Sequence, residues 1–260
     1  MTIALLLDID GTLVELRDHH DQVAVDPGLG ALLDRLQGAL DGALALVSGR
    51  TIAVIDRLLS PRRYAAAGLH GLEMRSEPGG MVEIFQDATL PAAARDATEA
   101  LAAVQPGIVI EDKGRTLALH YAIGFTGRAM LEQALENIVQ RLAPGWTVQS
   151  GRRLLELRPS NVDKGLACER LMAQPRFAGR APVIIGDDMT DLHAFDYARR
   201  VGGLAISVDD RIAHAADVRL NAPADARAWL VRLHRRLLDD PCLGVETLRT
   251  LHVRGPTRAR

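Results

Sequence analysis

Two aspartates, Asp8 and Asp10, stand one residue apart directly after the apolar run IALLL at 3–7, and Gly11 and Thr12 follow them. Like charges placed this close repel each other, so they need a compensating cation or a chemical task. Paired carboxylates can hold Mg²⁺, which prefers oxygen ligands. One carboxylate can also attack phosphorus as a nucleophile while the other transfers a proton. The pair therefore indicates metal-assisted phosphoryl transfer.

Three more polar clusters lie at the ends of predicted elements. Ser-Gly-Arg at 48–50 and Gly-Asp-Asp at 186–188 each end an apolar run, and Asp-Lys-Gly at 163–165 begins a predicted helix. A single aspartate at the end of a strand is usually a turn former or a helix cap. Four clusters in such positions point to a shared site, because the carboxyl ends of parallel strands gather polar loops at one edge.

Each cluster supplies a side chain suited to one task in that chemistry. Asp8 and Asp187 are candidate Mg²⁺ ligands, with Asp188 or Asp191 further out. A second acid such as Asp10 can protonate the leaving oxygen and later deprotonate the attacking water.

A lysine and several smaller residues complete the clusters on the substrate side. Lys164 offers a compact positive charge to the transferring phosphoryl group. Gly11 permits a tight turn that brings backbone N–H groups close to a phosphate. The candidate substrate-binding residues of this part of the chain are Thr12 and Ser48, which offer hydroxyl donors, together with Gly49 and Arg50.

Arg50 has two interpretations. It can bridge to the phosphate, to the rest of the substrate or to an inserted domain, or it can be a plain cation at the start of a helix. A cation there is unfavourable beside the helix dipole, which slightly favours a functional role.

An alternating pattern of strands and helices positions these clusters. Short apolar runs predict buried strands of a parallel sheet, and runs with helical periodicity follow them. The sequence therefore predicts a doubly wound, Rossmann-like α/β fold. The strands are predicted at 3–7, 43–47, 64–67, 182–185 and 204–208, and the helices at 29–40, 52–59, from Lys164 onward and 223–238.

The middle of the chain has a different pattern. Strands follow strands with only two helices among them, which predicts an inserted α+β domain with an antiparallel sheet. We predict a discontinuous core of 1–73 and 159–240, an inserted domain of 74–158 and a loose tail of 241–260. The inserted strands are predicted at 81–85, 107–111, 116–123, 146–149 and 153–157, and the inserted helices at 91–104 and 127–142.

Composition narrows the function classes. Aromatic residues make up only 3% of the 260 residues, and the net charge is -2, which argues against a stacking platform or a basic surface for nucleic acid. The two cysteines, Cys168 and Cys242, fit no metal or disulfide spacing and suit a reducing compartment. The N-terminal apolar run is too short to span a bilayer. We expect a cytoplasmic monomer that binds a small molecule, with no nucleic-acid or membrane partner.

In chain order the clusters are DIDGT, the serine of SGR, the lysine of DKG and GDDMTD, and this ordered set resembles the haloacid dehalogenase superfamily. The resemblance covers the whole predicted core. It implies that Asp8 is the nucleophile, that Asp10 is the general acid/base and that Lys164 is the third catalytic residue. It also implies that Mg²⁺ is held by Asp8, the backbone carbonyl of Asp10, and Asp187, with Asp188 beside them. The presence of both Asp8 and Asp10 is typical of the phosphatase branch.

Within that superfamily the chain most resembles the trehalose-6-phosphate phosphatases. This similarity implies Mg²⁺-dependent hydrolysis of trehalose 6-phosphate to trehalose and phosphate, through an aspartyl-phosphate, as a step of trehalose biosynthesis. It also implies that the insert is a cap that closes over the core. The supporting stretches are LVSGR (46–50), AGLHGLEMR (67–75), EDKGRTLALHY (111–121), LELRPSNVDKG (155–165) and GDDMTD (186–191).

The insert supplies polar side chains that can read a sugar. The resemblance favours Lys113, Glu156, Arg158 and Asn161 as contacts, and Glu111 and His120 lie on the same predicted strands. The alternative is that these residues alternate along half-exposed strands and simply face water.

One position departs from the resemblance. The family usually continues GDDxTD with glutamate, and here Leu192 follows Asp191. We expect activity to survive with a changed rate or metal affinity. The other open readings are a phosphatase for sucrose phosphate, a glycosyl-phosphoglycerate or a hexose phosphate, a phosphomutase, and a non-catalytic sugar-phosphate sensor, which Leu192 alone favours.

Overall fold

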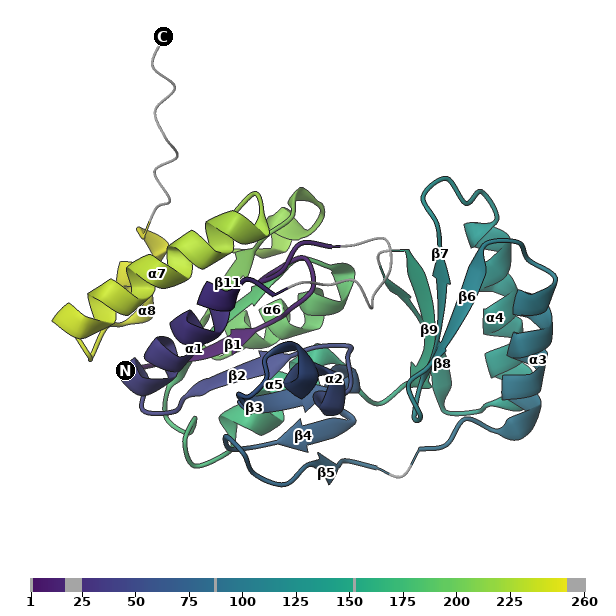
Figure 1. Cartoon of the computed structure of the whole chain (residues 1–260), viewed down its shortest axis with the longest axis horizontal. Helices are drawn as coiled ribbons and strands as arrows, with labels where there is room; N and C mark the ends of the chain where they lie inside the picture. The colour runs from purple at the N-terminus through teal and green to yellow at the C-terminus, as the bar shows by residue number, and fades with distance from the viewer. Residues whose placement is uncertain (1, 17–24, 87, 152, 252–260) are drawn as a thin grey trace, which may run out of the picture. The chain divides into compact units, whose positions relative to one another are not determined.

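The chain forms two compact units (Figure 1). The computed structural model describes residues 2–16, 25–86, 88–151 and 153–251. The first unit combines Met1–Glu83 with Lys164–Arg260, and the second is the continuous segment Ile84–Asp163. The second unit thus begins at Ile84, where the sequence analysis placed the start of the insert at 74, and it ends at Asp163 rather than at 158.

A mostly parallel sheet forms the centre of the first unit. Its strand β1 lies between β2 and β10 and pairs in parallel with both. All five residues of β1 are buried, which explains why the run is continuously apolar instead of alternating. The sheet confirms the predicted α/β class. Its strands, in spatial order, are β12 (Val218–Arg219), β11 (Leu204–Ser207), β10 (Ala181–Gly186), β1 (Ile3–Leu7), β2 (Leu44–Val47), β3 (Ala65–Gly68), β4 (Glu73–Arg75) and β5 (Glu83–Ile84).

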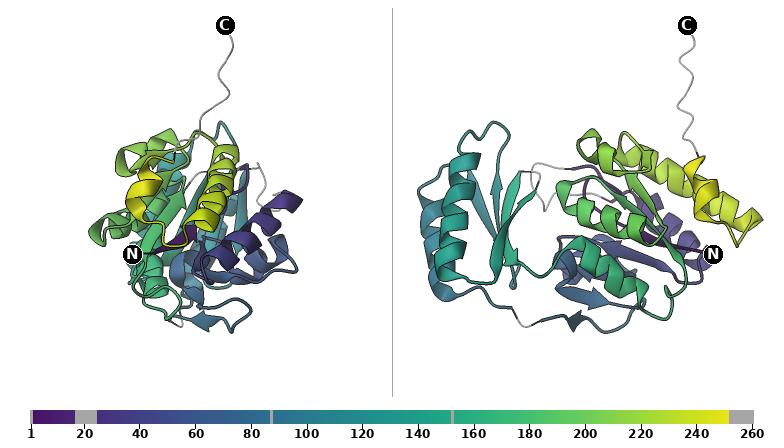
Figure 2. Two further views of the ribbon diagram at one scale, coloured as in Figure 1. Left: turned by 90° about the vertical axis from the view of Figure 1, so that its left-hand side faces the viewer. Right: turned by 180° about the vertical axis from the view of Figure 1, so that it is seen from behind.

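Helices lie on both sides of this sheet (Figure 2). Helix α1 packs with α7, and α5 packs with α6. In α1, Asp26 accepts a hydrogen bond from the Gly28 N–H at 2.7 Å, Pro27 begins the helix, and leucines at helical spacing enter the core. The helices are α1 (Pro27–Ala39), α2 (Ile52–Leu58), α5 (Lys164–Met172), α6 (Leu192–Arg200), α7 (Pro223–Asp239) and α8 (Val245–Arg249).

Several elements of the first unit differ from the sequence-based expectation. Helix α6 was not predicted, although its buried residues follow helical spacing, and neither were the short strands β4 and β12. Strand β5 lies at the edge of the large sheet, whereas 81–85 was predicted as a strand of the insert.

The predicted loose tail from residue 241 is wrong for the part that the structure describes. Leu243 and Leu248 are buried in the core of the first unit, and Leu248 belongs to α8. The rest of that predicted tail, 252–260, lies outside the described residues.

The second unit is an antiparallel sheet with two helices, as the α+β prediction required. One face of the sheet packs its leucines against α3 and α4 and forms a separate core. Side chains alternate along each strand, so Glu111, His120 and Glu156 lie on the other face. The strand order is β6 (Ile108–Asp112), β7 (Leu117–Tyr121), β9 (Leu154–Pro159) and β8 (Trp146–Gly151), and the helices are α3 (Ala92–Ala103) and α4 (Arg128–Leu142). Among all the described residues, none of the helices combines the length and the apolar character needed to cross a bilayer.

Candidate active site

Asp8 lies at the carboxyl end of β1, where a neighbouring strand fixes its backbone. Its N–H donates to the Ile185 carbonyl of β10 at 3.0 Å, and the residue is only 6% exposed. The chain then turns back on itself, because the Leu13 N–H donates to the Ile9 carbonyl at 2.8 Å. This turn carries Asp10, whose side chain is less deeply buried than that of Asp8.

The same turn brings a second carboxylate, that of Asp187, next to Asp8. Gly11 has a φ of +79°, and a Cβ at this position would lie 2.2 Å from the Asp187 Oδ2, so only glycine fits. The Thr12 hydroxyl lies 3.2 Å from an oxygen of Asp8 and 3.2 Å from an oxygen of Asp187. Its single hydrogen can be donated to either of them.

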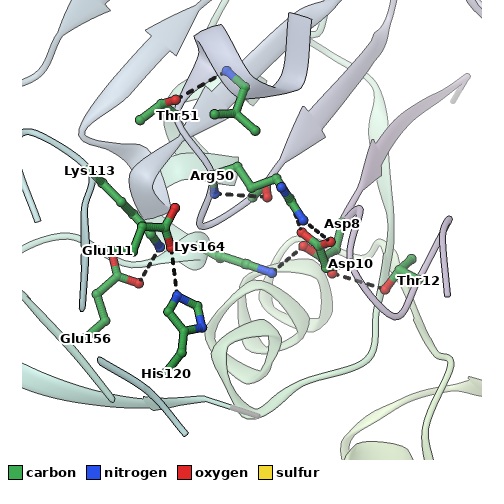
Figure 3. A network of polar contacts seen from close by, with 12 residues as sticks. Asp8, Asp10, Thr12, Arg50, Thr51, Glu111, Lys113, His120, Glu156 and Lys164 are labelled. Carbon is green, nitrogen blue, oxygen red and sulfur yellow. Dashed lines mark hydrogen bonds and ion pairs between the residues drawn. The ribbon is translucent and has the colours of Figure 1, made fainter. Parts of the chain in front are cut away.

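Lys164 is the first residue of α5, and its ammonium lies between two carboxylates (Figure 3 shows its contact with Asp8). Its Nζ donates to Asp8 Oδ1 and to Asp191 Oδ1, at 2.7 Å in each case. Burial by itself would lower the pKa of Lys164, but Asp191 and Asp8 outweigh this effect and raise it. The ammonium therefore stays charged beside the nucleophile.

Asp191 holds the loop after β10 in place. Its Oδ2 accepts the N–H groups of Asp187 and Asp188 at 3.1 and 3.0 Å. The Asp188 side chain in turn caps η3 (Met189–Asp191), so the two acids form a capping box. The sequence analysis placed Asp191 further out, whereas the structure places it inside the cluster. The spacing Asp-x-x-Asp at 188–191 is the signal that could have revealed this role.

Asp8, Asp187 and Asp191 form a buried group that can hold a metal ion, with one oxygen of each within 4.8 Å of the others. Burial raises the pKa of Asp8 to about 7, although Lys164 partly offsets this effect. Burial, and then the charge of Asp8, raise the pKa of Asp187 well above its usual range. A raised pKa of this kind means that too little positive charge lies nearby to stabilise the ionised carboxylates, and a bound cation would supply it. A donor set made only of oxygen atoms suits Mg²⁺. The residues present therefore fit Mg²⁺.

Asp188, which the sequence analysis also assigned to the metal, contacts an arginine. Its carboxylate lies 3.3 Å from Arg211 Nη1. A metal role for Asp188 and for the backbone carbonyl of Asp10 remains a prediction.

Asp10 forms a bidentate ion pair with Arg50 (Figure 3). The Arg50 Nε and Nη2 donate to the two carboxylate oxygens at 2.6 and 2.8 Å. Planar, charge-assisted pairs of this kind fix both side chains. The sequence analysis assigned both residues to the site but not to each other, because their separation in sequence gives no signal of the pairing.

The loop between β2 and α2 positions Arg50. The Arg50 N–H donates to Ser48 Oγ at 3.2 Å. Glu73 of β4 accepts the Ile52 N–H at 2.6 Å and so satisfies the N-terminus of α2. A Cβ at residue 49 would lie 2.8 Å from His70 Nε2, which explains the glycine between Ser48 and Arg50. Sequence reasoning did not single out Glu73.

A family model and curated relatives identify the family of this chain. A family model described as trehalose-phosphatase matches residues 6–223. This chain belongs to the trehalose-phosphatase family. A probable trehalose-phosphate phosphatase of Sinorhizobium fredii is 42% identical over 205 residues, which is 79% of this chain and 77% of that protein. The trehalose-6-phosphate phosphatase of Escherichia coli is 38% identical over 234 residues, 87% of this chain and 85% of that protein.

A solved structure has the same fold as this chain. The C-terminal domain of the Candida albicans trehalose-6-phosphate phosphatase superposes with a TM-score of 0.78. It is 21% identical, and the match covers 90% of this chain and 92% of that one.

In the second unit of this trehalose-phosphatase family member, the structure brings together only some of the predicted sugar contacts. Lys113 Nζ lies 3.1 Å from Glu156 Oε2, and the Thr116 hydroxyl donates to Glu156 Oε1 at 2.6 Å. Arg158 donates to the carbonyls of Pro159 and Val162 and to Gln149 Oε1, at 2.7 Å in the last case. Lys113 and Glu156 thus form one cluster, while Arg158 has its hydrogen-bond partners elsewhere in the second unit.

Asn161 has a separate partner in the same unit. Its Nδ2 donates to Gln86 Oε1 at 2.7 Å. Its role as a sugar contact, like that of Arg158, remains a prediction.

Proposed function

We propose that this chain hydrolyses trehalose 6-phosphate to trehalose and phosphate through an aspartyl-phosphate at Asp8. The observation that carries the proposal is the buried Asp8, held by Lys164 at 2.7 Å, with Asp10 on the turn that follows it paired to Arg50. Membership of the trehalose-phosphatase family indicates which substrate to propose.

In the first half-reaction, an oxygen of Asp8 attacks phosphorus and the bond from phosphorus to the sugar oxygen breaks. Asp10 donates its proton to that sugar oxygen, which leaves as the hydroxyl of trehalose. Asp10 must therefore release at least one oxygen from Arg50 to carry the proton. Lys164 offsets the negative charge that gathers around Asp8 and the phosphoryl group.

In the second half-reaction, Asp10 takes a proton from water, the water oxygen attacks phosphorus, and the bond from phosphorus to Asp8 breaks. Phosphate leaves and Asp8 is regenerated as a carboxylate. Asp8 and Asp187, with Asp191 beside them, would hold Mg²⁺, which draws negative charge from the phosphoryl oxygens when bound. Thr12, Ser48, Gly49 and Arg50 are the proposed contacts at the phosphate end.

We assign sugar recognition to the second unit, with Lys113 and Glu156 as the principal contacts and Arg158 and Asn161 as further ones. The Lys113–Glu156–Thr116 cluster supports this assignment, because it offers donors and acceptors held in fixed positions. We also place the reaction in the cytoplasm and treat the working form as a monomer. Cys168 and Cys242 fit no metal or disulfide spacing, which suits a reducing compartment.

The testing experiment measures phosphate release from trehalose 6-phosphate, glucose 6-phosphate and sucrose 6-phosphate, each with Mg²⁺ and with excess chelator. Selective, Mg²⁺-dependent release from trehalose 6-phosphate supports both the chemistry and the sugar assignment. Equal release from all three keeps the phosphatase chemistry and removes the sugar assignment. A folded protein that releases no phosphate from any of them contradicts the proposal and favours a sensor.

A further inference from the structure

A polar row crosses the face of the second unit's sheet that is turned away from α3 and α4. Ala118 of β7 is opposite Glu111 of β6 on one side and Glu156 of β9 on the other, and Glu156 is opposite Gln149 of β8. Residues directly opposite in an antiparallel pair share a face. The row therefore places one carboxylate on each side of the small, buried Ala118.

His120 lies on the same face as Glu111 and contacts it. It is two residues beyond Ala118 on β7, and its Nε2 lies 2.8 Å from Glu111 Oε2 (Figure 3). An ionised carboxylate only accepts hydrogen bonds, so the imidazole N–H is the donor. Their side chains are 23% and 24% exposed, so the pair is neither in the core nor freely solvated.

The position of this pair differs from that of an ordinary surface ion pair in the same unit. Arg95 pairs with Asp112, the next residue of β6, at 2.7 Å. Asp112 points to the opposite side of the strand, because side chains alternate, and it is 52% exposed. The Glu111–His120 pair instead shares its face with the Lys113–Glu156–Thr116 cluster.

A sugar hydroxyl is recognised best by an acceptor that does not have to be ordered when the ligand arrives. A carboxylate has several acceptor positions, and a hydrogen bond to one oxygen fixes the direction of the other. Imidazole suits this task because it has few rotatable bonds and donates from a defined position. Such supporting contacts keep a recognition residue in its productive orientation.

We propose that His120 is a positioning residue for Glu111, which it orients to accept hydrogen bonds from the hydroxyls of a neutral sugar. This inference rests on the proposed function, since it assigns Glu111 to the sugar part of the substrate. Glu111 and the Lys113–Glu156 pair then contact the sugar from the two sides of Ala118.

The test separates sugar recognition from phosphate chemistry. Calorimetry measures the Kd of trehalose, which has the sugar but no phosphate, for the wild type, His120→Ala and His120→Gln. Steady-state kinetics with Mg²⁺ give KM and kcat for trehalose 6-phosphate and for p-nitrophenyl phosphate, which has no sugar. Arg95→Gln is the matched control, because it removes an ion pair of similar length from the same unit.

The expected result is an increase of about three- to tenfold in the trehalose Kd and in KM for trehalose 6-phosphate in His120→Ala, the size of one lost hydrogen bond. KM for p-nitrophenyl phosphate stays at the wild-type value. His120→Gln, which keeps a donor, recovers most of the loss, and Arg95→Gln behaves as the wild type.

Two results overturn the inference while leaving the proposed function intact. One is an unchanged KM for trehalose 6-phosphate in His120→Ala. The other is an equal rise in KM for both substrates without rescue by glutamine, which indicates a structural role only. A wild type that neither binds trehalose nor hydrolyses its phosphate overturns the proposed function itself, and this inference with it.

Discussion

The ionised Asp8 carboxylate is the proposed nucleophile, but its burial without metal destabilises the folded chain. It is buried next to Asp187 and Asp191, and without metal its pKa rises to about 7 from an ordinary value of 3.8. At pH values between about 3.8 and about 7, the folded chain therefore binds more protons at Asp8 than the unfolded chain does. The stability that Asp8 contributes is therefore complete below about 3.8 and is lost as the pH rises through about 7.

Asp8→Asn removes this titration along with the nucleophile. We expect no detectable phosphate release, because the amide cannot form the aspartyl-phosphate. In the presence of chelator at pH 8 the variant should melt a few degrees above the wild type, and the difference should shrink toward pH 4. Thermal melts across this pH range check the sign. A variant that melts below the wild type at pH 8 would show that Asp8 is not destabilising in the metal-free protein.

Asp10 differs from Asp8 because its contribution depends on the leaving group. We expect Asp10→Asn to lower kcat for trehalose 6-phosphate about 10²- to 10⁴-fold, the usual share of a general acid and base. With p-nitrophenyl phosphate, whose leaving group needs no proton, nitrophenolate should appear in a burst and then slowly. Stopped-flow absorbance measures this. Asp210→Asn, at an exposed aspartate of the same unit, is the control and should leave both phases unchanged.

At the scale of elements, the turn after β1 is fixed by close packing against the loop after β10. Gly11→Ala introduces a Cβ that would lie 2.2 Å from Asp187 Oδ2 and places it on a backbone with a φ of +79°. We expect the Mg²⁺ concentration for half-maximal activity to rise at least severalfold, because Asp187 has to move. Isothermal titration of Mg²⁺ into the variant checks the affinity independently of activity.

Gly202→Ala provides a matched control for the backbone strain. Gly202 has a φ of +73°, and a Cβ there meets no atom within 4 Å. Both variants should lose about 1–2 kcal/mol of unfolding free energy from the left-handed conformation. Only Gly11→Ala should weaken Mg²⁺ binding, and equal losses of affinity in the two variants would contradict the packing argument.

The strands of the first unit were predictable because their burial on both faces leaves continuous apolar runs, as at 3–7. The clusters were predictable because parallel strands end at a common edge. The sequence could not reveal how the side chains pair. Arg50 and Asp10 are 40 residues apart, and Lys164 and Asp8 are 156 apart, so only the folded sheet brings each pair together.

The sequence analysis did not predict some elements correctly. It overlooked helix α6, although its buried residues Ala194, Phe195, Tyr197 and Ala198 follow helical spacing. Strand β5 is two residues long and follows a turn, so its sequence does not say which sheet it joins. The residues near 241 are rich in charge and lack a clear pattern, yet Leu243 and Leu248 are buried.

At the scale of the whole molecule, each unit has its own core, and the metal-binding acids belong to the first unit alone. Mg²⁺ should therefore slow backbone hydrogen exchange around 8–14 and 186–191 and leave 84–163 unchanged. Exchange measured by mass spectrometry with Mg²⁺ and with chelator checks this. Asp187→Asn should abolish the effect, and protection spread evenly over both units would contradict a site confined to the first.

The position of β1 between β2 and β10 has a consequence for the order of synthesis. As the chain leaves the ribosome, β1 can pair with β2 early, but its other edge must wait until residues 181–186 have emerged. The continuous segment 84–163 has all of its own strands by then and can fold ahead of the first unit, whose sequence is in two parts. Asp8 is thus made before Lys164, Asp187 and Asp191, so the nascent chain gains hydrolytic power only after residue 191 has emerged.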